Sequence, residues 1–214
     1  MIPSAVLFDC DGVIVDSEGP TFLMLQADFA AHGLPLTLHE LETNWIGATA
    51  EDLHLRARSE GATLPDDWVS DFYLRLNRRL AEGVSLIPGI VSVLDALDRA
   101  GIPYAVCSNG TLPKMQVTLG QHGLLARLNG HIYSGQALGR PKPAPDVYLH
   151  ASRALDVAPE TTVVIEDSPT GARAARAAGI RCFGYAPLGL HPGLTAEGAT
   201  LFQRMTDLPA LIGL

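Results

Sequence analysis

Four short polar segments of the chain contain side chains that could take part in catalysis. The first holds Asp9 and Asp11, two residues apart, directly after an apolar run. If the backbone stays extended there, both carboxylates point the same way. Two close carboxylates cannot both be charged cheaply, so the pair either binds a cation or separates its pKa values. Such a pair suits a group transfer in which one Asp attacks, while the other protonates the leaving oxygen and later activates water.

The second segment, Ser108-Asn109-Gly110, and the third, around Lys142, offer groups that could hold an anion. The Ser108 hydroxyl could donate to a phosphoryl oxygen, and the backbone N–H groups of Asn109 and Gly110 could form an anion nest at a helix start. Taken alone, each has an ordinary alternative, a polar turn or a surface lysine. Only their order and spacing together indicate one site.

The carboxylates of the first and fourth segments create a charge problem that a metal ion would solve. The four that would together repel a phosphate are Asp9, Asp11, Glu166 and Asp167. A hard divalent cation such as Mg²⁺ favours carboxylate oxygens, phosphate and water, and would offset half of this charge. With Lys142 added and the acid proton on Asp11, the site becomes neutral. We therefore expect Mg²⁺ as the cofactor and a small phosphorylated molecule as the substrate.

Three of the four segments directly follow strand-like apolar runs. Strands are expected at residues 5–8, 104–107, 131–133, 162–165, 181–185 and 200–202. Helices are expected at residues 88–100, 114–122, 145–155 and 169–178, the last with Ser168 as N-cap and Pro169 at its first position. This alternation predicts an α/β fold with a parallel sheet between two helical layers. Ligands bind at the carboxyl ends of such strands, where the polar segments lie.

The stretch from about residue 21 to residue 83 breaks this alternation, because it contains helical patterns and no convincing strand. One pattern holds Phe22, Leu23, Leu25 and Phe29. A second holds Trp68, Phe72, Leu76 and Leu80, whose spacing is that of a helix face in contact with a core. We therefore expect an all-helical insert, residues 17–85, in an α/β core made of residues 1–16 and 86–214.

All four polar segments resemble the motifs of the haloacid dehalogenase-like phosphatases, in order and over essentially the whole chain. The matching segments read FDCDGVIVDSE at 8–18, VCSNG at 106–110, GRPKPAPD at 139–146 and VIEDSPTG at 164–171. The resemblance implies a Rossmann-like three-layer core with a four-helix cap of the family's first type. It also implies a phosphatase rather than a dehalogenase, because dehalogenases of the family lack the second Asp.

The resemblance further implies a role for each residue of the motifs. Asp9 would be the nucleophile, and Asp11 the general acid and base, with its backbone carbonyl on Mg²⁺. The phosphoryl group would be held by Ser108 and Lys142. The metal would be held by Asp167, with Glu166 beside it, and by Asp9. The loop at residues 45–52 matches the cap's substrate-specificity loop, so Gly47 and Thr49 are expected to contact substrate, although a plain helix–helix turn is the alternative.

Among members of the family, the chain looks most like the sugar-phosphate phosphatases, including those that act on 6-phosphogluconate. The expected substrate is therefore a sugar phosphate or a sugar-acid phosphate. A β-phosphoglucomutase is the alternative, but those mutases carry a cap-side His and Arg where this chain has Thr21 and Ala50. A non-catalytic binding protein on the same fold is less favoured, because a scaffold has no need of all four motifs. Five cap arginines could meet an anionic substrate: Arg56, Arg58, Arg75, Arg78 and Arg79.

Bulk properties narrow the partners and the compartment. The net charge of -8 opposes general binding to nucleic acid or anionic membranes, because the summed field repels phosphate. The three cysteines form no CxxC pair and lie in or beside apolar runs, which is typical of a reducing compartment. No signal peptide or membrane span is visible. We expect a cytoplasmic protein that is a monomer or a weak homodimer.

Overall fold

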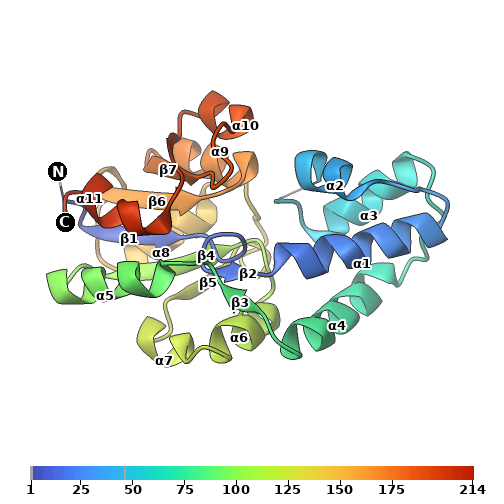
Figure 1. Cartoon of the computed structure of the whole chain (residues 1–214), viewed down its shortest axis with the longest axis horizontal. Helices are drawn as coiled ribbons and strands as arrows, with labels where there is room; N and C mark the ends of the chain where they lie inside the picture. The colour runs from blue at the N-terminus through green and yellow to red at the C-terminus, as the bar shows by residue number, and fades with distance from the viewer. Residues whose placement is uncertain (1, 46) are drawn as a thin grey trace.

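A six-stranded parallel sheet forms the centre of the larger part of the molecule (Figure 1). The structure is a computed structural model and describes residues 2–45 and 47–214. The sheet has the strand order β5-β4-β1-β6-β7-β8, and every neighbouring pair is parallel. Its strands are β1 (Ala5–Phe8), β4 (Tyr104–Ser108), β5 (Ile132–Ser134), β6 (Thr162–Glu166), β7 (Arg181–Tyr185) and β8 (Thr200–Phe202). The expected parallel α/β fold is confirmed.

Helices cover both faces of this sheet. One face carries α5 (Ile90–Ala100), α6 (Leu112–Gly120), α7 (Leu124–Leu128) and α11 (Leu208–Leu211), and the other carries α8 (Asp146–Ala154), α9 (Pro169–Ala177) and α10 (Pro192–Ala196). Within the described residues, no helix combines the length and apolarity that crossing a bilayer requires.

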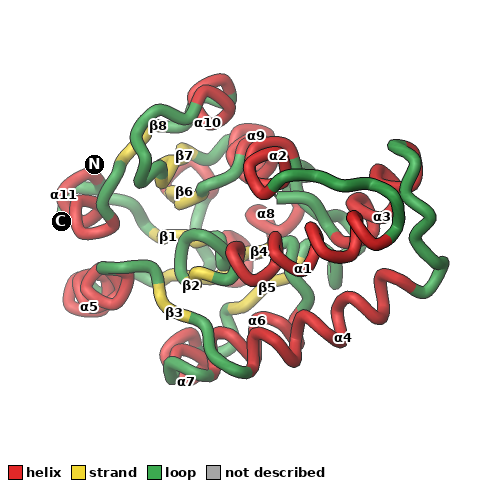
Figure 2. Tube along the Cα trace, turned by 45° about the vertical axis from the view of Figure 1, so that its right-hand side comes forward, coloured by secondary structure: helices red, strands yellow, loops and turns green. Residues whose placement is uncertain are grey.

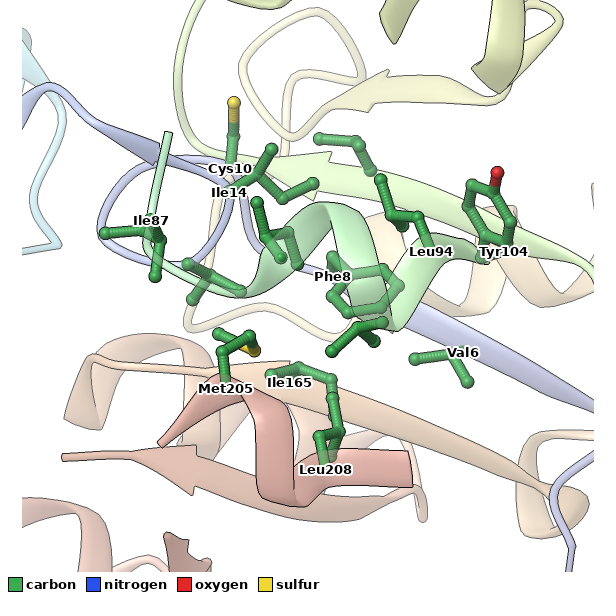
Figure 3. Close-up of a cluster of buried hydrophobic side chains, with 14 of the residues drawn as sticks. Val6, Phe8, Cys10, Ile14, Ile87, Leu94, Tyr104, Ile165, Met205 and Leu208 are labelled. Atoms are coloured by element: carbon green, nitrogen blue, oxygen red, sulfur yellow. The ribbon is translucent and has the colours of Figure 1, made fainter. Parts of the chain in front are cut away.

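Strand β1 lies at the centre of the sheet because its side chains are apolar on both faces. Val6 and Phe8 point into the core under α5 and α11 (Figure 3), while Leu7 packs into the second core, under α8 and α9. All of these side chains are fully buried. A strand covered on both faces reads as a continuous apolar run, which is why a four-residue segment is recognisable in the sequence.

Four further helices form a separate bundle beyond the carboxyl ends of the strands (Figures 1 and 2). They are α1 (Glu18–Ala31), α2 (Leu38–Asn44), α3 (Ala50–Ser59) and α4 (Trp68–Ala81), and they enclose a hydrophobic cluster of their own. The predicted helical face of Trp68, Phe72, Leu76 and Leu80 is buried in it. Leu23, from the first predicted pattern, is 55% exposed instead, because it lies on the solvent side of α1.

Two very short strands join this bundle to the core. β2 (Val15–Asp16) and β3 (Ser85–Leu86) pair antiparallel, where the chain enters and leaves the bundle. They lie at the boundaries predicted between the core and the helical insert. The division of the chain into these two domains stays a prediction. We refer to the bundle, residues 17–85, as the cap, and to the rest as the core.

Candidate active site

All of the predicted site residues line one cavity between the cap and the carboxyl ends of the strands. They are Asp9, Asp11, Gly47, Thr49, Ser108, Asn109, Gly110, Lys142, Glu166 and Asp167. Asp9 directly follows β1, while Ser108 and Glu166 end the two neighbouring strands, β4 and β6. The cavity has a volume of about 120 Å³.

Asp9 shares a buried lysine with Glu166. The Nζ atom of Lys142 lies 2.6 Å from Asp9 Oδ1 and 2.6 Å from Glu166 Oε1. Burial raises the pKa of Asp9 to about 7, against the opposing charge of Lys142. Burial acts to lower the pKa of Lys142, but its two carboxylate partners outweigh this and raise it. The lysine therefore stays charged beside Asp9 and can also attract an incoming phosphoryl oxygen.

Glu166 is fixed in place by several donors besides Lys142. Its Oε1 accepts a hydrogen bond of 2.8 Å from the Tyr148 hydroxyl, and its Oε2 accepts from the Ser168 hydroxyl at 2.9 Å. Gly171 makes room for it, since a Cβ at that position would lie 1.6 Å from Glu166 Oε1. With both oxygens occupied and no exposed surface, Glu166 holds Lys142 and the end of β6 in a defined arrangement.

Asp11 lies in a different electrostatic environment from Asp9. Its Oδ1 is 2.7 Å from Lys114 Nζ and also accepts a short hydrogen bond from the Ser17 hydroxyl, while the Ser108 hydroxyl lies 3.4 Å from its Oδ2. Burial acts to raise the pKa of Asp11, but the charge and the hydrogen bond of Lys114, together with Ser17, outweigh it and lower the pKa. The two neighbouring carboxylates thus have pKa values shifted in opposite directions, upward for Asp9 and downward for Asp11.

Three carboxylates could hold a metal ion. Asp9, Glu166 and Asp167 each offer an oxygen, and these oxygens lie within 4.8 Å of one another. Gly12 supports this fit, because a Cβ at that position would lie 1.8 Å from Asp167 Oδ2. Any larger residue would displace this carboxylate. Burial, and then the negative charges of Glu18 and Glu166, raise the pKa of Asp167 well above its ordinary value. A hard cation such as Mg²⁺ would relieve that repulsion.

The second motif, Ser108-Asn109-Gly110, forms hydrogen bonds within itself and to neighbouring segments. The Ser108 hydroxyl accepts the backbone N–H of Gly110 at 2.9 Å, so this amide is already satisfied within the motif. The Asn109 side chain donates to the backbone carbonyls of Gly47 and Lys142, and its Oδ1 accepts the Lys142 N–H at 2.7 Å. Asn109 therefore connects the cap loop to the segment that carries Lys142.

The predicted specificity loop closes over the core, although Ile46 lies outside the described residues. Gly47 has a φ of 77°, and a Cβ there would be 3.1 Å from the side chain of Ser168, so glycine permits this close approach. The hydroxyl of Thr49 is the N-cap of α3 and accepts from the N–H of Asp52. A second link joins cap and core, because Gln136 Nε2 donates to the Tyr73 hydroxyl at 2.6 Å.

Two charged residues of the cavity were missed by the sequence reasoning. Lys114 was expected to begin a helix, but α6 starts at Leu112, with Thr111 as its N-cap, so Lys114 lies in the first turn and faces Asp11. The signal that could have found it is Thr111 followed by a proline at the second helical position. Glu18, at the start of α1, also lines the cavity, and burial followed by the charges of Asp11 and Asp9 raises its pKa to about 8.

The chain is similar in sequence to known hydrolases. A sequence model of the haloacid dehalogenase-like hydrolases matches residues 3–179. The chain is 32% identical to hexitol phosphatase A of Escherichia coli K12, over 81% of this chain and 78% of that protein. It is 29% identical to 6-phosphogluconate phosphatase of the same organism, over 97% of this chain and 93% of that protein.

A solved structure of a related protein has a similar fold. A variant of CbbY from Rhodobacter sphaeroides, in complex with xylulose 1,5-bisphosphate, superposes with a TM-score of 0.79. It covers 97% of this chain and 96% of its own, at 29% identity. The Rossmann-like core with a helical cap is therefore shared with a protein of related sequence.

Proposed function

The chain belongs to the haloacid dehalogenase-like hydrolases, and we propose that it is a Mg²⁺-dependent phosphatase of small sugar phosphates or sugar-acid phosphates. The observation that carries the proposal is the pair of carboxylates after β1. Asp9 is paired with Lys142, and Asp11 with Lys114 and Ser17. The family match and the phosphatases among its relatives support the reaction class.

In the proposed first step, an oxygen of Asp9 attacks phosphorus, and the bond from phosphorus to the substrate's alcohol oxygen breaks. Asp11 gives its proton to that alcohol oxygen. Its pKa is lowered while it pairs with Lys114, so it must gain a proton before this step. The negative charge of a bound phosphate ester raises the pKa of Asp11 and so favours that protonation.

In the second step, Asp11 takes a proton from water, and the water oxygen attacks phosphorus. The bond between phosphorus and Asp9 breaks, which releases inorganic phosphate, frees the Asp9 carboxylate and leaves Asp11 protonated again. Ser108 and Lys142, which both line the cavity, orient the phosphoryl oxygens. Asp9 and Asp167 would hold Mg²⁺, with Glu166 beside them, and the bound ion would supply positive charge to the phosphoryl oxygens.

The cap favours a phosphatase over the alternative mutase. A mutase must grip the second phosphate of a sugar bisphosphate, for which a planar cationic group is suited. Thr21 and Ala50, which stand where the mutases have His and Arg, both line the cavity, and neither can carry a positive charge. Since one chain contributes the whole site, we also propose that a monomer or weak homodimer is active.

Phosphate release in the presence and absence of Mg²⁺ tests this function. We expect turnover of sugar phosphates with Mg²⁺, its loss in excess chelator, and its loss below detection in Asp9→Asn with folding retained. Asp16→Asn is the matched control, because Asp16 is exposed on β2 and does not line the cavity. Appreciable hydrolysis by Asp9→Asn, full turnover in chelator, or isomerisation of β-glucose 1-phosphate that outpaces phosphate release would contradict the proposal.

A further inference from the structure

The cap contributes an apolar wall to the cavity. The six large apolar side chains that line it from this side are Phe22, Leu25, Trp45, Leu53, Phe72 and Leu76. They belong to the hydrophobic cluster of the cap, so their positions are set by packing. Apart from the Glu18 carboxylate at the edge of the cap, polar atoms on this wall are few and uncharged, such as the hydroxyls of Thr21 and Tyr73. The leaving group of the substrate therefore meets a surface that can pack against carbon and hydrogen-bond to hydroxyls.

The five cap arginines are not among the described residues that line the cavity. Arg56 lies over the Trp45 ring at 3.9 Å and pairs with Glu60, while Arg75 pairs with Asp28. The remaining ones, Arg58, Arg78 and Arg79, are exposed, and none of the five is among the described residues that line the cavity. Within the described lining of the cavity, the cap therefore contributes no guanidinium group.

The two lysines of the cavity are already engaged at its phosphoryl end. Lys142 pairs with Asp9 and Glu166, and Lys114 pairs with Asp11. The carboxylate of Glu18 also lies at the cap edge of the cavity, with Oε2 3.3 Å from where a Cβ on Gly12 would be. Among residues 2–45 and 47–214, no cation that lines the cavity is left to pair with a second anionic group. Such a group would be desolvated against apolar side chains without a partner, which is costly.

We infer that the substrate is a phosphate monoester of an uncharged alcohol, such as a polyol or a neutral sugar, and that the cavity discriminates against leaving groups with a carboxylate or second phosphate. This inference rests on the proposed phosphatase function and narrows its substrate class. It favours the uncharged members of the expected sugar phosphates over sugar-acid phosphates such as 6-phosphogluconate. Discrimination arises because the charged leaving group finds no partner, rather than from its size.

Matched substrate pairs test the inference directly. Glucitol 6-phosphate and 6-phosphogluconate share one carbon chain and differ only by a terminal hydroxymethyl group or carboxylate. Glycerol 3-phosphate and 3-phosphoglycerate form a shorter pair. We expect the neutral member to have a kcat/KM at least about tenfold higher in each pair that is turned over. An acidic member that is hydrolysed as well as its neutral partner would overturn the inference.

A charge placed on the wall sharpens the test. Ala48 lines the cavity and is exposed, so Ala48→Arg can place a guanidinium beside the leaving group without disturbing the cap's core. We expect this variant to narrow the ratio between the neutral and acidic members severalfold. Leu55→Arg is the matched control, since Leu55 is 69% exposed on α3 outside the cavity, and it should leave the ratio unchanged. An unchanged ratio in Ala48→Arg, or an equal change in both variants, would count against the inference.

p-Nitrophenyl phosphate separates failure of the inference from failure of the proposed function. If this general substrate is hydrolysed with Mg²⁺ while no member of either pair is, the inference is wrong and the phosphatase proposal stands. If p-nitrophenyl phosphate and both pairs release no phosphate, the proposed function itself fails, and the inference fails with it.

Discussion

The two sides of the cavity differ in the chemistry of their side chains. On the core side, Asp9, Asp11 and Glu166 are buried or half-buried and paired with Lys142 or Lys114. On the cap side, apolar residues such as Phe72 face the cavity. The core side provides charges for a reaction that is the same for any phosphate ester, whereas the cap side can select by shape, by hydrogen bonds to hydroxyls and by the lack of an unpaired cation among its described residues. Substitutions on the core side should therefore change the turnover of every substrate. Substitutions on the cap side should change the turnover of some substrates only.

The largest expected effect outside Asp9 is that of Asp11→Asn. The amide keeps the size of the side chain but can no longer donate or accept the catalytic proton. Alcohol release in the first turnover of a sugar phosphate should slow by about 10²–10⁴-fold. The effect should be small for p-nitrophenyl phosphate, whose leaving group needs no proton. Rapid-quench measurement of the first turnover checks this, and an equal loss for both substrates would exclude Asp11 as the acid.

Lys114→Met should destabilise the protein, because it leaves Asp11 without its lysine partner. Breaking a buried ion pair costs about 3–5 kcal/mol. We expect about 3 kcal/mol, at the low end of that range, because 20% of the Asp11 side chain is exposed. The double variant with Asp11→Asn should recover at least about 1 kcal/mol of the loss. Urea denaturation of the single and double variants measures this coupling.

A surface ion pair of the cap is the control for that cycle. Arg79 pairs with Glu82 at 3.3 Å, and both side chains are about half exposed or more. Arg79→Met should change the free energy of unfolding by less than about 1 kcal/mol. If Arg79→Met lowered the free energy of unfolding as much as Lys114→Met does, the distinction between the ion pairs of the core and those of the cap would be wrong.

Metal removal should make stability depend on pH. The pKa of Asp9 is raised to about 7 and that of Glu18 to about 8, so the folded protein holds protons that the unfolded chain loses near pH 4. Its stability without metal should therefore be greatest near or below that pH and should fall as the pH rises toward 8. Mg²⁺ should raise Tm more at pH 8 than at pH 6, by at least about 2 °C.

Asp167→Asn provides the matched comparison for this effect. The variant keeps the size of the side chain but removes one of the crowded negative charges. Thermal unfolding should then depend less on pH, and Mg²⁺ should have little effect. A metal-free Tm of the unmodified protein that rises between pH 5 and pH 8 would show that these carboxylates are not protonated in the folded state.

The smallest effect should be optical and confined to one tryptophan of the cap. Trp45 lines the cavity, whereas Trp68 lies within the cap cluster and donates to Asp28 Oδ2 at 2.8 Å. Beryllium trifluoride with Mg²⁺ and a polyol should change the fluorescence of the protein. The change should vanish in Trp45→Phe and survive in Trp68→Phe. The opposite pattern would move the substrate-facing wall to another part of the cap.

The core side of the site could be predicted from sequence because it depends on local patterns. Ser108 and Glu166 end buried apolar strands, and Asp9 follows another, so their shared edge follows from the parallel sheet. The position of Lys142 came from resemblance to the family, since no strand precedes it directly. Lys114 was missed because its role depends on where α6 begins. The predicted start of this helix was two residues too late, and the boundaries of helices are the least certain part of a prediction from sequence.

The cap side was less predictable for a physical reason. Helical spacing indicates that Phe72 and Leu76 contact a core, and they do. The same two side chains also line the cavity, and spacing cannot distinguish a core contact from a substrate contact. The strands β2 and β3 are two residues each and leave no periodic signal. Their pairing depends on segments about 70 residues apart in the chain.

The most direct test of the account is to capture the phosphoryl group on Asp9. Asp11→Asn should form the intermediate rapidly with p-nitrophenyl phosphate and Mg²⁺, but should hydrolyse it slowly because the base is missing. We predict a burst of about one p-nitrophenolate per active site, and, after acid quenching, a phosphorylated peptide whose modified residue is Asp9 by mass spectrometry. A linear release of p-nitrophenolate without a phosphorylated peptide, or phosphate found on Ser108 instead, would contradict the covalent mechanism.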